Sequence, residues 1–83
     1  MKKLYAVYLG GRIKEENFIE DHEIVFVVAE DEKEARSLGR EKWNAMDIHV
    51  DGTKLVENID GFSISLSENN EQDKIIDNNE YSK

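Results

Sequence analysis

Two short segments, both apolar on the two faces of an extended strand, constrain the fold of this chain most. Residues 3–9 are rich in Tyr, Val and Leu, and residues 24–29 are almost entirely β-branched or aromatic. This composition predicts two strands. A single helix can cover only one face of the sheet that they would form, so the other face needs a second cover.

The small size of the chain makes a cover for the second face of the sheet more important. An 83-residue chain is at most one domain, and a domain this small buries only about 60% of the surface that its unfolded chain exposes. Cysteine is absent, so disulfides cannot compensate for a small core. We therefore expect a homodimer joined through sheet faces or edges. A strongly curled sheet that covers its own far side, or cover by the C-terminal tail, is the alternative.

A helix is expected to begin at Asp31. Its carboxylate can accept a hydrogen bond from a first-turn amide, and Glu34 can reach back in an acidic form of the capping box. Apolar positions follow at helical spacing as far as Met46 and include Trp43. Gly39 inside this helix predicts a close approach of the helix to the sheet.

The remaining core-forming residues predict extended structure. Residues 48–50 begin a third strand that is expected to turn at Asp51-Gly52 and to continue at 55–56. Asp60-Gly61 is a second turn signal, and 62–67 alternates apolar residues with serine as a half-buried strand does. The predicted fold is α+β in the order β-β-α-β-β, a small, mainly antiparallel sheet with one helix on one face. Residues 1–67 form the domain, and 68–83 form an acidic tail of a composition typical of disorder.

The net charge of −8 limits the classes of partner. Nucleic acid is disfavoured because phosphate binding requires a basic surface, and anionic membranes are disfavoured for the same reason. The apolar run after Lys3 is too short for a signal peptide, and no segment approaches the length of a membrane span. We expect a cytoplasmic protein.

The Gly10-Gly11 pair follows the first predicted strand and invites comparison with phosphate-binding loops. The glycine spacing of a dinucleotide-binding motif and the Gly-Lys-Ser/Thr ending of a P-loop are both missing, and Lys14 is followed by two glutamates. We therefore interpret the pair as a tight turn with positive φ that ends the strand.

Polar residues beside the strands form the candidate functional site: Glu20, His22, His49, Asp51 and Asp60. Within each of the pairs Glu20/His22 and His49/Asp51, the residues are two apart and share a face of an extended chain. If the pairs meet, their nitrogen and oxygen donors suit zinc, manganese or iron, and a histidine beside a carboxylate can act as a general base. Turn formation, capping and mutual pairing explain the same residues without a ligand. The sequence predicts no cofactor, and a divalent metal is a candidate only.

The sequence also carries no recognisable catalytic signature. The serines of 62–67 lie on a regular strand pattern and not in a nucleophile elbow. We therefore favour a non-enzymatic homodimeric binding or assembly module, with a small metal-dependent or acid-base enzyme as the alternative. An acidic decoy that occupies a basic surface is a third possibility.

In its order of motifs the chain resembles the bacterial family catalogued as domain of unknown function 1543. The resemblance covers about residues 3–66 and rests on Tyr8-Leu9-Gly10-Gly11, Asn17, Glu20, His22-Glu23, Phe26-Val27-Val28, Trp43, His49-Val50-Asp51 and Asp60-Gly61-Phe62. It implies that Glu20, His22, His49 and Asp51 belong to one recurring pattern, and it implies no activity. The family often has a Pro-Gly-Ala-like loop after the double glycine, where this chain has residues 12–16 of different composition, so any role of that loop does not carry over.

Overall fold

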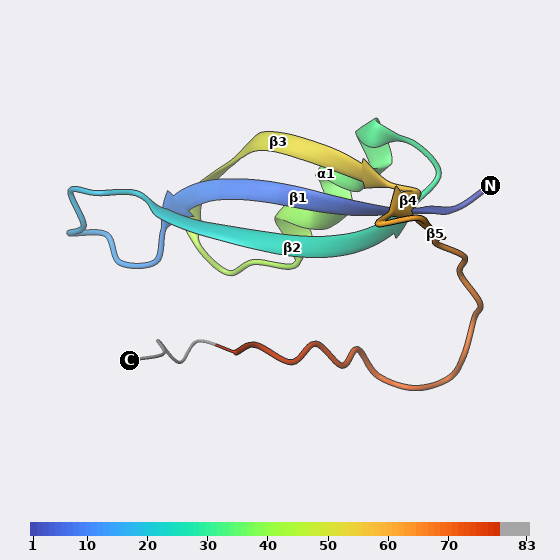
Figure 1. The fold of residues 1–83 in the computed structure, drawn as a ribbon. Coiled ribbons are helices and arrows are strands. Elements are labelled where there is room, and N and C mark those ends of the chain that lie inside the picture. Colours follow the sequence, from blue (N-terminus) through green and yellow to red (C-terminus); the bar gives the residue numbers. More distant parts are fainter. Residues whose placement is uncertain (79–83) are drawn as a thin grey trace, which may run out of the picture.

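A computed structural model describes residues 1–78 and confirms the predicted α+β fold. The elements in chain order are β1 (Lys3–Arg12), β2 (Asp21–Ala29), α1 (Glu32–Glu41), β3 (Met46–Val56), β4 (Asn58–Ile59) and β5 (Phe62–Ser63). The first three strands form an antiparallel sheet in the order β2-β1-β3, and β4 and β5 form a separate two-stranded hairpin (Figure 1).

The core lies between α1 and one face of the three-stranded sheet. Val7 and Leu9 of β1 are its largest fully buried side chains, and Val27 and Ala35 pack in the same cluster. The helix approaches β1 closely because Gly39 has no side chain: an added Cβ would lie 2.8 Å from Val7 Cγ1. The predicted reason for a glycine at this position is therefore confirmed.

The start of α1 is capped as the sequence predicts. The Asp31 carboxylate accepts a hydrogen bond from the backbone N–H of Glu34 at 2.8 Å. The Glu34 carboxylate accepts one from the N–H of Glu30 at 2.7 Å. The first bond satisfies an amide that a helix start leaves without a partner. The second joins Glu34 to the residue before the N-cap, one position earlier than in a capping box.

The end of α1 comes earlier than predicted. The helix stops at Glu41, where the N–H of Lys42 donates to the Gly39 carbonyl in a tight last turn. Met46 instead begins β3 and pairs with Arg12, while Trp43 packs against the core from the connecting segment. The prediction that Trp43 and Met46 belong to the helix is wrong because pairing in the sheet overrides helical spacing.

Two predicted turns are absent. Gly10 and Gly11 lie inside β1 and have no positive φ, so they do not end the strand in a turn. Asp51 and Gly52 lie inside β3, where the register shifts from Tyr8↔Gly52 to Leu9↔Val50 and leaves Asp51 as an extra residue. Asp51-Gly52 is thus part of a β-bulge, which disrupts the ladder locally and redirects side chains.

The last predicted strand is much shorter than 62–67. It lasts only through β5 and pairs with β4 instead of the main sheet. The turn at Asp60-Gly61 is confirmed, with φ of 52° and 82° at its two residues, as a two-residue type I′ hairpin requires. Residues 64–78 form no helix or strand. Part of the proposed tail, 79–83, lies outside the described residues.

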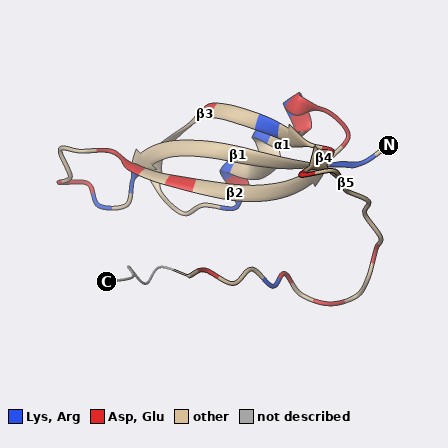
Figure 2. Ribbon diagram, in the orientation of Figure 1, with Lys and Arg blue, Asp and Glu red and all other residues tan. Residues whose placement is uncertain are grey.

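The face of the sheet opposite α1, here called the uncovered face, carries alternate residues of the strands: Leu4, Ala6 and Tyr8 of β1, Ile24, Phe26 and Val28 of β2, and Lys54 of β3. Figure 1 views the sheet from this side, with α1 behind it. Ile24 is 48% exposed, and Phe26 and Val28 are each 41% exposed. Figure 2 shows that β1 has no charged residue between its ends.

No helix in the described part of the chain has the length and apolarity needed to cross a membrane.

Candidate functional site

Four of the five predicted site residues lie together at one end of the uncovered face, and we call them the Glu-His cluster: Glu20, His22, His49 and Asp51. His49 Nε2 lies 3.4 Å from a Glu20 oxygen and 3.1 Å from an Asp51 oxygen. His22 Nε2 lies 3.6 Å from the other Glu20 oxygen and 4.0 Å from the other Asp51 oxygen. Each carboxylate therefore lies between the two imidazoles.

The register of the sheet brings the two histidines together. Gly10 of β1 pairs with His22 on one side and with His49 on the other. Residues directly opposite one another in neighbouring strands project to the same face, so both imidazoles project to the uncovered face with Gly10 between them. The bulge at Asp51 then allows its carboxylate to lie beside His49.

Gly10 forms the floor of the Glu-His cluster. A Cβ atom on Gly10 would lie 2.7 Å from His49 Nε2 and 3.0 Å from an Asp51 oxygen. Real Cβ atoms essentially never approach as closely as the first distance, so any larger residue would displace these side chains. The glycine predicted as a turn residue is instead the residue that makes room for the cluster.

The β1–β2 loop, residues 13–20, ends at Glu20 and is held by polar contacts at its base. The Asp21 carboxylate accepts hydrogen bonds from the Ile13 N–H at 2.8 Å and from the Asn17 amide at 3.0 Å. Arg12 pairs with Asp47 and donates to the Glu15 carbonyl. These contacts connect the loop that carries Glu20 to the start of the strand that carries His49.

The backbone near His49 is also unusual. Asp47 has a positive φ of 54°, a conformation that aspartate adopts more readily than most residues. Its carbonyl oxygen lies 3.4 Å from His49 Nδ1. That contact places the Nδ1 side of the ring toward the backbone and leaves Nε2 facing the two carboxylates.

The Glu-His cluster is accessible from solvent. Its side chains range from 44% exposed for Asp51 to 64% exposed for His22. A groove of about 710 Å³ begins beside them and continues along the uncovered face past Tyr8, Ile24 and Phe26, and Asp77 of the C-terminal segment also borders it. With two carboxylates beside two imidazoles, the cluster can attract a cation or exchange a proton with a bound molecule.

As placed, no three or more His, Asp or Glu side chains in residues 1–78 are arranged to hold a metal ion. The short distances within the Glu-His cluster are therefore contacts between its own histidines and carboxylates. Mutual pairing of this kind is also what the alternative interpretation from the sequence expects.

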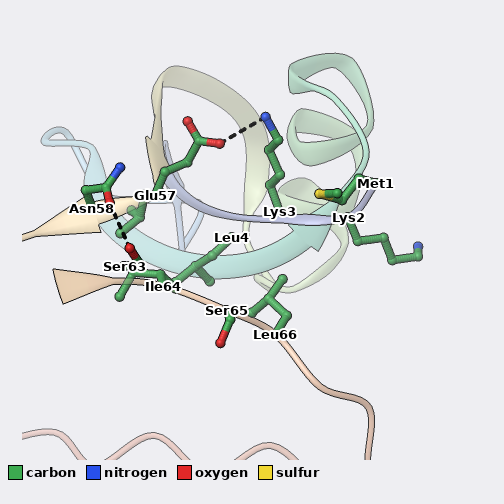
Figure 3. Close-up of a pocket in the computed structure, with 11 residues that line it drawn as sticks. Met1, Lys2, Lys3, Leu4, Glu57, Asn58, Ser63, Ile64, Ser65 and Leu66 are labelled. Carbon is green, nitrogen blue, oxygen red and sulfur yellow. Dashed lines mark hydrogen bonds and ion pairs between the residues drawn. The ribbon is translucent and has the colours of Figure 1, made fainter.

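Asp60 lies apart from the other predicted site residues. It occupies the β4–β5 turn, beyond the end of β3 where Val56 pairs with Leu4. The Glu-His cluster lies at Gly10, six residues away along β1, or about 20 Å at the rise of an extended strand. The end of the sheet near Asp60 has its own pocket, bordered by an ion pair of 3.0 Å between Lys3 and Glu57 and by Leu4, Ile64 and Leu66 (Figure 3).

Sequence reasoning missed three residues that shape the Glu-His cluster: Gly10, Asp21 and Asp47. The role of Gly10 depends on residues that lie about 40 positions later in the chain. The position of Asp21, between Glu20 and His22, is a signal that could have identified it as the anchor of the loop.

Comparison with known proteins identifies a family for this chain and indicates no activity. The family model described as "Domain of Unknown Function (DUF1543)" matches residues 17–66. This match includes all members of the Glu-His cluster and leaves Gly10 outside. No curated protein and no solved structure matches the chain significantly.

Proposed function

The chain belongs to the DUF1543 family, and we propose that it is a non-enzymatic binding or assembly module that forms a homodimer through its uncovered face. The observation that carries this proposal is the exposure of Ile24, Phe26 and Val28 in one row of β2. A contiguous exposed apolar surface on a small domain is typical of an interaction site.

The small core supports a second copy of the chain as the occupant of this face. The buried hydrophobic residues of the described part are few and lie almost wholly between α1 and the sheet: Tyr5, Ala6, Val7, Leu9, Val27, Ala29 and Ala35. A shared interface would add apolar burial worth roughly 25 cal/mol per Å² of surface removed from water. Small domains gain stability in this way when they lack disulfides.

The charges on the uncovered face also fit a two-fold arrangement. Lys54 lies beside the Tyr8 ring, 5.9 Å from its centre, and pairs in the sheet with Ala6. The Glu-His cluster lies four residues further along β1, about 14 Å away. A two-fold axis near Tyr8 would place Lys54 of each copy opposite the acidic end of the other.

Sedimentation velocity of the full chain at micromolar concentration tests this proposal. We expect a species of twice the 9.6 kDa chain mass, and we expect Phe26→Asp to shift it to the monomer because a charge would be buried in the interface. Phe18→Asp is the matched control, because Phe18 is fully exposed in the β1–β2 loop. A wild-type chain that stays monomeric, or a Phe26→Asp chain that stays dimeric, would refute the proposal.

Acid-base catalysis by the Glu-His cluster is the second candidate function. The observation that favours it is that the exposed imidazole of His22 lies 3.6 Å from a Glu20 carboxylate oxygen, so that a carboxylate stands beside a solvent-accessible base. Screening the wild-type chain and the His22→Gln/His49→Gln double variant against model esters, phosphates and peptides tests it. Catalysis requires turnover that the double variant loses; absence of turnover, or equal turnover by both chains, excludes the cluster as an active site.

A further inference from the structure

We propose that Glu20, His22, His49 and Asp51 bind one divalent transition-metal ion of the zinc, manganese or iron(II) class. This inference does not depend on the proposed homodimer or on catalysis. It concerns only what the Glu-His cluster, at one end of the uncovered face, binds.

The distances around the Glu-His cluster scatter about those between the ligands of such an ion. The four nitrogen–oxygen distances are 3.1, 3.4, 3.6 and 4.0 Å, and together they close a ring in which imidazoles and carboxylates alternate. Zinc bonds to these donors are roughly 2.0–2.2 Å long. In a tetrahedral site, bonds of that length separate neighbouring donor atoms by about 3.3–3.5 Å. The His49–Glu20 distance lies in this range, and the other three lie on either side of it. Each carboxylate faces the two imidazoles through different oxygens, so both oxygens are available as donors.

The side chains as placed do not hold an ion, so they must move to enclose one. Its longest side joins His22 to Asp51 at 4.0 Å. His22 is also the most exposed member at 64%. Because this imidazole is exposed, an inward rotation would shorten that side of the ring without moving the backbone of the sheet.

Gly10 gives a second, independent indication of a built site. The strand has no side chain at the one position where a Cβ would lie 2.7 Å from His49 Nε2. A glycine inside a strand weakens the strand, so its presence beneath converging donors is explained by the room that they need. The approach of His49 Nδ1 to the Asp47 carbonyl at 3.4 Å resembles the orienting contact that metal-bound histidines make through their second nitrogen.

The donor set selects the class of ion. Neutral imidazole suits zinc, iron and other transition metals, and carboxylates add manganese. Copper(I) prefers sulfur ligands, and the chain contains no cysteine. Calcium and magnesium prefer sites made entirely of oxygen ligands, whereas half of this cluster is nitrogen.

Histidine-ring NMR of the full chain at pH 7, titrated with Zn²⁺ and separately with Mn²⁺, is the direct test. We expect one equivalent of Zn²⁺ to shift the ring signals of both His22 and His49, and Mn²⁺ to broaden both. The His22→Gln/His49→Gln double variant should bind at least 10- to 100-fold more weakly, because that is roughly the cost of losing even an outer-shell partner. Both substitutions lie on exposed side chains, and the backbone amide spectrum verifies the fold.

The Gly10→Ala variant tests whether Zn²⁺ binds at the Glu-His cluster or is only attracted to an acidic protein in general. We expect it to weaken Zn²⁺ binding about 10-fold or more by displacing His49. Gly52→Ala is the matched control on the same face, because its added Cβ would meet only Tyr8 at an ordinary 3.8 Å. Histidine signals that do not respond to either ion overturn the proposal, and so does Zn²⁺ binding of equal affinity in the double variant.

Discussion

Gly39 of α1 lies directly against Val7 of β1, so that a Cβ added to the glycine would approach Val7 Cγ1 to 2.8 Å. Val7 is fully buried, and its β-branched side chain has little rotameric freedom. This contact sets the distance between the helix and the sheet. It also explains why a poor helix former occupies the interior of a ten-residue helix.

Gly39→Ala should therefore destabilise the fold although it improves helix propensity. Overpacking of a core costs about 1–3 kcal/mol, whereas replacing glycine by alanine in a helix gains about 1 kcal/mol. We expect a net loss of roughly 1 kcal/mol in the free energy of unfolding, measured by urea denaturation. Ser37→Ala, on the exposed side of α1, is the control and should be neutral or slightly stabilising. A more stable Gly39→Ala chain would contradict the packing argument.

Asp31→Ala should weaken the start of α1. The substitution removes the acceptor for the Glu34 N–H at 2.8 Å, and loss of an N-cap costs about 1 kcal/mol. Asp31→Asn separates capping from charge, since asparagine caps equally well. We expect Asp31→Asn to retain most of the unfolding free energy in urea denaturation. Equal losses in the two variants would show that the charge of Asp31 matters and its hydrogen bond does not.

The Lys3–Glu57 ion pair should make a pH-dependent contribution to stability. Its hydrogen bond and its charge attraction raise the pKa of Lys3 above the ordinary value of 10.5. A pKa that is raised in the folded state adds stability below the unfolded-state pKa, and that stability is lost as the pH rises through the folded-state pKa. We expect the Tm of Glu57→Gln to lie below that of the wild type at pH 8.

The same Tm difference should shrink above pH 10.5, as Lys3 loses its charge in the wild type. Lys3→Gln is the control and should show the same trend with pH. A difference that persists or grows at high pH would mean that Glu57 acts through contacts other than this pair.

The sequence predicted the order of elements because it depends on local signals. The apolar strands, the Asp31 cap and the Asp60-Gly61 turn are each encoded within a few residues. The end of α1 was mispredicted because helical spacing continues through Trp43 to Met46. Only the pairing of Met46 with Arg12 determines that the chain is extended there.

The candidate site was predictable in composition and not in geometry. Spacing alone indicated that Glu20 and His22 share a face, as do His49 and Asp51. It could not indicate that the two pairs meet, because this depends on the register that places Gly10 between His22 and His49. The bulge at Asp51 is a similar case, since Asp-Gly inside a strand has the same local sequence as a turn.

Adjacent glycines in β1 should respond differently to the same substitution, because different atoms lie beside them. A Cβ on Gly11 would meet the Met46 carbonyl oxygen at 2.9 Å and the Trp43 ring at 3.2 Å. The backbone oxygen can move only if β3 moves, so we expect Gly11→Ala to cost roughly 1–3 kcal/mol of unfolding free energy.

A Cβ on Gly10 meets only the ends of the His49 and Asp51 side chains, which are exposed and can rotate away. We therefore expect Gly10→Ala to cost less than Gly11→Ala in urea denaturation followed by Trp43 fluorescence, and to leave the native emission unchanged. Gly11→Ala should shift that emission, because the new methyl group contacts the indole. Equal losses of stability would mean that the Glu-His cluster is as rigidly held as the backbone of β3, and that its members cannot rotate to admit or release an ion.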